Sequence, residues 1–231
     1  MKKKVIAIAL LGAILSIIIY FFTQTSEITI VSIGDGLSLG MTAYGIEGIS
    51  FNDYLSNDYK TEHKLKSYIH EFANAGKTIK ELIYEIKENR SITIKNEEIE
   101  IKQAINEADI LTIAIGMDEL ATTKITNQIK EEYLHDLEEL LSMISMLNQK
   151  KVIIVSLYAW GKNDFLTVEK LNASIRDIAL TNGFLFVDIN KIMMNQEYFL
   201  TTDSYYINYL GHKEIYNEIK KRLNSKVSSR K

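Results

Sequence analysis

The chain has 231 residues, of which 46% are hydrophobic and 25% are charged, and its formal net charge at pH 7 is -3. This length and composition suit one globular domain with a full core, and the slightly acidic balance argues against a nucleic-acid-binding surface. The sequence contains no cysteine, which excludes disulfides, thiolate zinc sites and a cysteine nucleophile.

Residues 1–24 have the pattern of a short cytoplasmic stub followed by a membrane anchor. Lysines at positions 2–4 precede the uncharged residues 5–22, a run near the lower length limit for a helix that spans a bilayer. The lysines predict a single-pass protein whose N-terminus stays in the cytoplasm and whose domain, residues 25–225, lies outside. The alternative is a cleaved signal peptide and a secreted domain, although residues 20–24 offer no small-x-small cleavage site.

The domain begins with a predicted strand over residues 28–31 that ends in a sharp turn. This apolar run leads through Gly34-Asp35-Gly36 into a segment with helical character. Such a sequence is typical of a buried parallel strand that turns into a helix, and open α/β sheets build their sites at these turns. Residues 51–59 follow as a helix or a cap.

A second strand and helix come next in the chain. Residues 66–73 predict a strand that ends in Asn74-Ala75-Gly76, and residues 78–87 place apolar side chains at helical spacing. Residues 90–96 are predicted to be a polar connection. A further helix is predicted from four apolar positions, Ile99, Ala104, Ile105 and Ala108.

The second half of the chain continues the alternation. The run over residues 110–115 is the clearest strand, and it ends in the segment Gly116-Met117-Asp118-Glu119-Leu120. The later elements are expected as a long helix around 133–147, a strand over 152–157, a helix over 168–180, a strand over 184–187 and a helix over 209–223. The basic segment from Lys220 onward is predicted to be solvated, with residues 226–231 as a tail.

This alternation predicts an α/β fold, a three-layer α/β/α sandwich around a parallel sheet of about five strands with right-handed crossovers. In such a sheet the carboxyl ends of the strands converge on one crevice. The residues expected to line it are Asp35, Ser38, Asn74, Gly76, Asp118, Glu119, Tyr158, Trp160 and Tyr206.

Four segments at these strand ends resemble the motifs of the SGNH (GDSL-type) hydrolases, in particular their secreted or membrane-anchored bacterial branch. The family motifs are G-D-S-L after the first strand, a glycine after the second, G-x-N-D after the third and D-x-x-H-P-N before the last helix. The corresponding segments here are Gly34-Asp35-Gly36-Leu37, Asn74-Ala75-Gly76, Gly116-Met117-Asp118-Glu119 and Asp203-Ser204-Tyr205-Tyr206-Ile207-Asn208. The match covers nearly the whole domain in the right order, and the resemblance implies a flavodoxin-like sheet.

The same comparison implies that the catalytic side chains have been replaced. In the family a serine attacks an ester carbonyl, a histidine takes its proton and an aspartate orients the histidine, while two backbone amides and an asparagine hold the oxyanion. The matching positions here are Gly36, Tyr206, Asp203, Gly76 and Asp118. Gly36 has no nucleophile, and a tyrosine with a pKa near ~10 is a poor base at neutral pH. The carboxylate of Asp118 would accept hydrogen bonds and repel an oxyanion.

Two nearby residues are candidates to replace the lost groups. Ser38 lies two residues after the nucleophile position, where helix capping or a hydrogen bond to the backbone is the ordinary role. His212 lies six residues after the base position, inside the last helix, where a surface or packing role is expected.

Carboxylates and tyrosines dominate the predicted crevice. Asp35, Asp118, Glu119 and Asp203 would suit a divalent cation, a cationic ligand or water activation if they gathered at one point. The alternative is that Asp35 and Glu119 hold loops through backbone amides, as the resemblance implies, and we assign no metal ion and no cofactor. An aromatic rim for stacking sugar rings, or else simply part of the core, is expected from Tyr44, Tyr158, Trp160, Tyr205, Tyr206 and Tyr209.

Three functional hypotheses follow from these residues. The preferred one is a membrane-anchored extracytoplasmic protein that has lost esterase chemistry and binds a ligand in its crevice, with a cell-wall or other glycan as the expected ligand. The alternative is an active ester, acyl or glycan hydrolase that uses Ser38 or a carboxylate-activated water. The third is a structural partner of another envelope protein.

Overall fold

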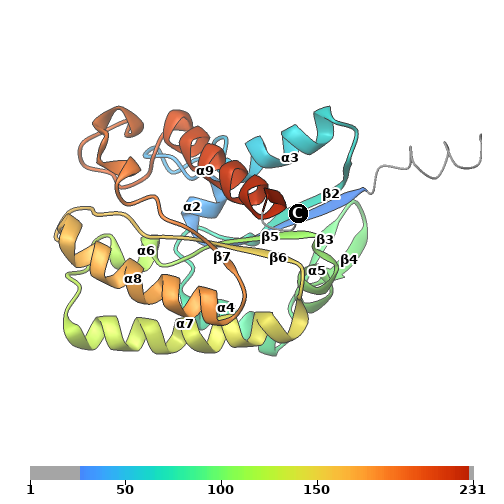
Figure 1. The fold of residues 1–231 in the computed structure, drawn as a ribbon, viewed down its shortest axis with the longest axis horizontal. Helices are drawn as coiled ribbons and strands as arrows, with labels where there is room; N and C mark the ends of the chain where they lie inside the picture. The colour runs from blue at the N-terminus through green and yellow to red at the C-terminus, as the bar shows by residue number, and fades with distance from the viewer. Residues whose placement is uncertain (1–26, 229–231) are drawn as a thin grey trace, which may run out of the picture.

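The computed structural model describes residues 27–228 (Figure 1). Among these residues no helix is both long and apolar enough to cross a membrane. The anchor predicted over residues 1–24 lies outside them, as does part of the predicted tail over residues 226–231.

The centre of the domain is a parallel sheet of five strands in the order β2-β1-β5-β6-β7. Its strands are β1 (Ile28–Gly34), β2 (Leu65–Ala73), β5 (Ile110–Ala114), β6 (Lys151–Val155) and β7 (Leu185–Val187). All five residues of β5 are buried, as expected for a central strand covered by helices on both faces. The predicted parallel sheet is confirmed, and the strand order is the flavodoxin-like one.

Helices cover both faces of this sheet, which gives the predicted three layers (Figure 1). On one face α3 packs against α9, and on the other α7 packs against α4, α5 and α8. The helices are α2 (Gly36–Leu39), α3 (Phe51–Thr61), α4 (Ile79–Lys87), α5 (Ile101–Glu107), α6 (Met117–Leu120), α7 (Asn127–Leu147), α8 (Phe165–Thr181) and α9 (Tyr209–Ser228).

One predicted connection is wrong, because residues 90–96 belong to a β-hairpin. Strands β3 (Ser91–Ile94) and β4 (Glu97–Glu100) pair antiparallel beside the main sheet. The two turn residues, Lys95 and Asn96, both have positive φ angles, 50° and 69°, as two-residue hairpin turns require. Ile99, assigned above to a helix, therefore lies in β4, and α5 starts only at Ile101.

Two further segments are more helical than the sequence pattern indicated. Residues 51–61 form the helix α3, which a capping box between Ser50 and Asp53 starts. Helix α9 continues past Lys220 to Ser228, so the predicted solvated segment is helical over those residues. It stays helical because Leu223 remains buried against the core.

A buried polar network joins α3 to the sheet beneath the first turn. The Asn52 amide donates to Ser32 Oγ at 2.7 Å and to the Ser38 carbonyl at 3.1 Å, and its oxygen accepts from Thr112 Oγ1 at 2.6 Å. All three side chains, Ser32, Asn52 and Thr112, are inaccessible to solvent. The network fixes the position of α2, because one of its bonds ends on the carbonyl of Ser38.

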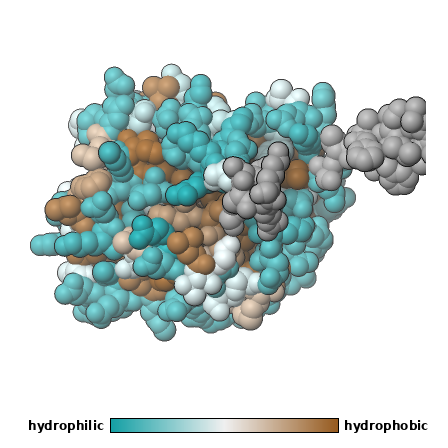
Figure 2. All heavy atoms as spheres, in the orientation of Figure 1, coloured by the Kyte–Doolittle hydropathy of each residue, from teal (hydrophilic) through white to brown (hydrophobic). Residues whose placement is uncertain are grey.

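The surface combines many hydrophilic residues with separate hydrophobic patches, as Figure 2 shows for one face. The exposed large apolar side chains come from many elements: Tyr44, Ile46, Ile49, Tyr84, Met146, Leu166, Leu180, Met194, Leu200, Tyr209 and Leu210. Single exposed apolar side chains of this kind are normal on the surface of a folded domain.

Candidate functional site

The turn after β1 is built as the sequence pattern predicts. Gly34 has a φ angle of +138°, and a Cβ atom there would lie 1.9 Å from the carbonyl oxygen of Ala114. Only glycine therefore fits this position. Asp35 is the N-cap of α2, and its Oδ1 accepts the N–H of Leu37 at 3.0 Å.

Asp118 closes the position that an oxyanion would occupy. Its Oδ2 accepts the backbone N–H of Gly36 at 2.9 Å and that of Gly76 at 2.6 Å. These are the two backbone amides that the sequence comparison places in the oxyanion site. The structure thus brings Gly36, Gly76 and Asp118 together through one carboxylate oxygen.

The carboxylates of Asp118 and Asp35 are linked through the backbone. The N–H of Asp118, in the first turn of α6, donates to Asp35 Oδ2 at 3.1 Å. Burial, together with the nearby charge of Asp118, raises the pKa of Asp35 from 3.8 to about 7. The second oxygen of Asp118, Oδ1, is buried without a hydrogen-bond partner among the described residues.

The Tyr206 side chain lies directly against Gly36. A Cβ atom on Gly36 would lie 2.8 Å from Asp118 Oδ2, 2.8 Å from Tyr206 Cε1 and 3.1 Å from the Tyr206 hydroxyl oxygen. The Tyr205 hydroxyl donates to the Tyr206 hydroxyl at 3.2 Å. Burial and the charge of Asp118 raise the pKa of Tyr206 above its usual value, so this hydroxyl stays protonated at neutral pH and is not a base.

Asp203 does not join this group. Its side chain is exposed, and it makes no hydrogen bond or ion pair with Tyr206. The aspartate–base pair that the family motif implies is therefore absent from the residues the structure describes.

Solved structures of microbial hydrolases share this architecture. LAE5, an alpha/beta hydrolase enzyme from the metagenome of Lake Arreo, Spain, has a TM-score of 0.59 at 19% sequence identity and covers 87% of this chain and 96% of its own. A lipase/acylhydrolase from Enterococcus faecalis has a TM-score of 0.62 at 16% identity, over 87% and 97%. The psychrotrophic esterase EstA from Pseudoalteromonas sp. has a TM-score of 0.61 at 13% identity, over 87% and 100%.

This chain has an SGNH hydrolase-like fold. The identities are low, so the likeness extends to the fold and not to the chemistry. No family model and no curated protein matches the sequence.

Neither candidate replacement is placed for catalysis in the SGNH-like domain. Ser38 is fully buried, and its hydroxyl lies 3.0 Å from the carbonyl oxygen of Ile33 and 3.1 Å from that of Ala114. His212 is 1% exposed and stacks on Phe51, and burial lowers its pKa to about 3. These two residues have the structural roles that the sequence favoured.

The remaining carboxylate of the predicted crevice, Glu119, supports a helix end. Its Oε2 accepts the N–H of Ile79, the first residue of α4, at 3.4 Å, and burial raises its pKa. The four carboxylates considered above do not gather at one point, and within residues 27–228 no three His, Cys, Asp or Glu side chains are grouped to hold a metal ion.

The aromatic residues expected to form a rim are mostly engaged in packing. Tyr158 is 3% exposed and its hydroxyl donates to the Tyr205 carbonyl. Trp160 packs on Phe199 with ring centroids 5.0 Å apart. Tyr158 therefore presents no open face at the crevice and Trp160 is half-buried, in contrast to Tyr44 and Tyr209, which are exposed.

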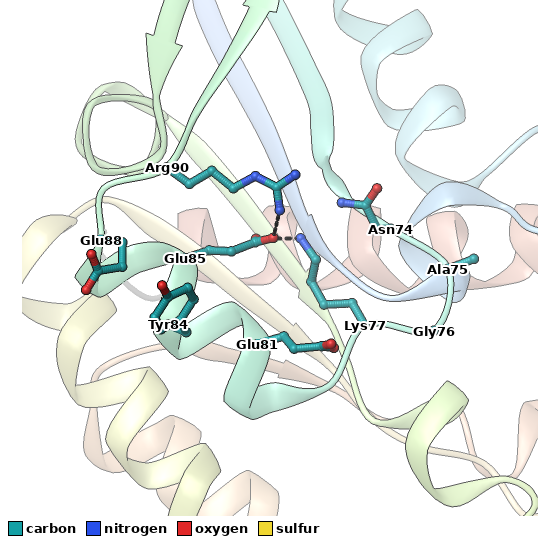
Figure 3. A pocket seen from close by; sticks show the side chains of 9 residues that line it. All are labelled: Asn74, Ala75, Gly76, Lys77, Glu81, Tyr84, Glu85, Glu88 and Arg90. Atoms are coloured by element: carbon teal, nitrogen blue, oxygen red, sulfur yellow. Dashed lines mark hydrogen bonds and ion pairs between the residues drawn. The ribbon is translucent and has the colours of Figure 1, made fainter.

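A separate open cleft of about 660 Å³ lies beside Gly76 (Figure 3). It is lined by the loop after β2, one face of α4 and the connection after α4: Asn74, Ala75, Gly76, Lys77, Glu81, Tyr84, Glu85, Glu88 and Arg90. Only Asn74 and Gly76 of this set were predicted. Tyr84 was missed because it lies on the polar face of an amphipathic helix, where a single tyrosine carries no motif.

Proposed function

We propose that this protein is a membrane-anchored, extracytoplasmic pseudoenzyme with an SGNH-like domain, which does not hydrolyse esters and binds a ligand at the cell envelope. A cell-wall or other glycan is the ligand class that we propose. The anchor is the uncharged run over residues 5–22.

The main observation in support of a loss of catalysis is that one oxygen, Asp118 Oδ2, accepts hydrogen bonds from the N–H groups of both Gly36 and Gly76. A tetrahedral oxyanion needs those two donors. To admit it, Asp118 would have to give up two charge-assisted hydrogen bonds, each contributing about 1.5–3 kcal/mol. The displaced carboxylate would then lie next to the new negative charge and repel it.

Two further features support this proposal. Gly36 has no side-chain atom that could form an acyl intermediate, and the space beside it is taken by Asp118 and Tyr206. The raised pKa of Tyr206 keeps its hydroxyl neutral, so the position of the family base holds no base at neutral pH.

The test uses the purified full-length chain with short p-nitrophenyl esters and a fluorophosphonate probe that labels reactive serines. We expect neither turnover nor labelling. Turnover or labelling that disappears in the Ser38→Ala variant would overturn the proposal in favour of a hydrolase with a rearranged site. The triple variant Gly36→Ser, Asp118→Asn, Tyr206→His is a rescue test, which asks whether the three side-chain types are all that the fold lacks for turnover.

The proposed location has its own test. Fractionation of cells that produce the full-length chain should place it in the membrane fraction, with the domain accessible to protease added from outside. A chain found free in the medium, with an N-terminus that begins after residue 24, would instead establish the cleaved signal peptide.

A further inference from the structure

We propose that the cleft beside Gly76 binds a neutral oligosaccharide, with the Tyr84 ring as the stacking platform. The inference rests on the binding role proposed above and places the ligand outside the closed SGNH-type crevice. Beside Gly36 there is no room for a ligand group, because Asp118 and Tyr206 already lie within 3.1 Å of the Cβ position of Gly36.

The charged groups at the centre of the cleft are already paired with one another. Glu85 is 6% exposed and lies between Lys77 and Arg90, as Figure 3 shows. The Lys77 Nζ donates to Glu85 Oε2 at 2.6 Å and to the Phe72 carbonyl at 2.6 Å, and Arg90 Nη1 donates to Glu85 Oε1. This triad forms a fixed polar floor and leaves other N–H groups of the Arg90 guanidinium free to donate.

Three polar side chains around this floor have no protein partner within the part of the chain that the structure describes. They are the Asn74 amide, the Tyr84 hydroxyl and the Glu88 carboxylate. Together with Arg90 they offer donors and acceptors of both kinds. Sugar hydroxyls donate and accept at once, so a mixed set of this kind matches them.

Tyr84 lies on the exposed face of α4, where its ring can stack on a sugar, and not in the core. Glu81, Tyr84 and Glu88 lie at a helical spacing that puts them on one face of α4, whereas Ile79, Leu82 and Ile86 on the other side are fully buried. Tyr84 is 65% exposed. The ring is held by a helix packed on the sheet, so it is presented to the cleft at a low entropic cost.

The charge of the lining argues against an anionic ligand. Lys77 and Arg90 face Glu81, Glu85 and Glu88, which leaves one excess negative charge. An anionic ligand would meet the unpaired carboxylate of Glu88, whereas the Lys77 ammonium is already paired with Glu85 and cannot offset that charge. A volume of about 660 Å³ lies in the range that binds small molecules.

The experiment measures binding of two neutral probes, N,N′,N″-triacetylchitotriose and cellotriose, by saturation-transfer NMR and calorimetry. The protein is the full-length chain in a detergent without a sugar head group. We expect at least one probe to bind, with affinity reduced about tenfold by Tyr84→Ala and several-fold by Asn74→Ala. The matched control is Leu166→Ala, which removes another large side chain of similar exposure, 62%, from a helix that does not line the cleft, and should leave the affinity unchanged.

Each result has a definite meaning. If neither probe binds, or if binding is insensitive to Tyr84→Ala, the inference is wrong. Loss of binding in Tyr209→Ala alone would move the sugar site to the rim predicted from sequence and also overturn it. These outcomes are separate from ester turnover, which tests only the loss of catalysis.

Discussion

Introducing a serine at position 36 alone should destabilise the domain without giving it esterase activity. The perturbation is Gly36→Ser. Gly36 is the first residue of α2 and is not among the glycines with positive φ, so serine can adopt its backbone conformation. The cost comes from contacts, because the new Cβ would lie 2.8 Å from both Asp118 Oδ2 and Tyr206 Cε1.

The size of the effect follows from two opposing terms. Overpacking of this kind costs about 1–3 kcal/mol. Replacing a glycine at a compatible backbone position restricts the unfolded chain and returns about 0.4–1 kcal/mol. We therefore expect Gly36→Ser to lower the free energy of unfolding by about 1–2 kcal/mol.

The assay is urea unfolding followed by circular dichroism, together with p-nitrophenyl acetate hydrolysis. A double-mutant cycle with Tyr206→Ala, which removes one of the two close neighbours, should reduce the cost of Gly36→Ser by at least about 0.5 kcal/mol. A Gly36→Ser variant as stable as the wild type, or one that hydrolyses the ester on its own, would refute the reasoning.

Three other predictions concern buried ionisable side chains, and each is checked by urea unfolding. Folding raises the pKa of Asp35 from 3.8 to about 7, so the wild type should lose stability as the pH rises from about 4 to about 7, and Asp35→Asn should lose less. Folding lowers the pKa of His212 from 6.5 to about 3, so the wild type should lose stability as the pH falls below about 6.5, and His212→Leu should lose less between pH 6.5 and 4. Lys77→Ala, which leaves the buried Glu85 with only one cation, should cost about 3–5 kcal/mol, whereas the control Lys87→Ala, an exposed surface pair, should change stability by less than about 1 kcal/mol.

The main sheet could be predicted because its strands carry continuous apolar runs separated by helical patterns. Residues 110–115 illustrate this, since every residue of β5 is buried and the sequence shows no competing period. The β3–β4 hairpin was missed because its strands are only four residues long and none of their residues is buried. The signals available were the alternation over Ser91-Ile92-Thr93-Ile94 and the following Asn96, since asparagine tolerates the positive φ angle that such a turn needs.

The candidate site was predicted in its positions but not in its contacts. The motif comparison placed Gly36, Gly76 and Asp118 together, and the structure does bring them together. It could not reveal that the Asp118 carboxylate turns inward onto both amides, because that depends on the space that Gly36 leaves. The Asp203–Tyr206 pair failed for a different reason, since a tyrosine cannot replace the histidine ring N–H that an aspartate orients.

The residues at positions 36, 118 and 206 depend on one another, so we expect a change at any one of them to cost stability. Glycine at 36 leaves room for the Asp118 carboxylate and the Tyr206 ring, and that carboxylate satisfies two amide donors that would otherwise be unpaired. A serine at 36 meets the carboxylate and the ring, while an asparagine at 118 exchanges two charge-assisted bonds for weaker neutral ones. Gly36→Ser or Asp118→Asn made alone is therefore expected to lower stability without giving esterase activity. Only a combined change can free the two amides to bind a substrate oxygen.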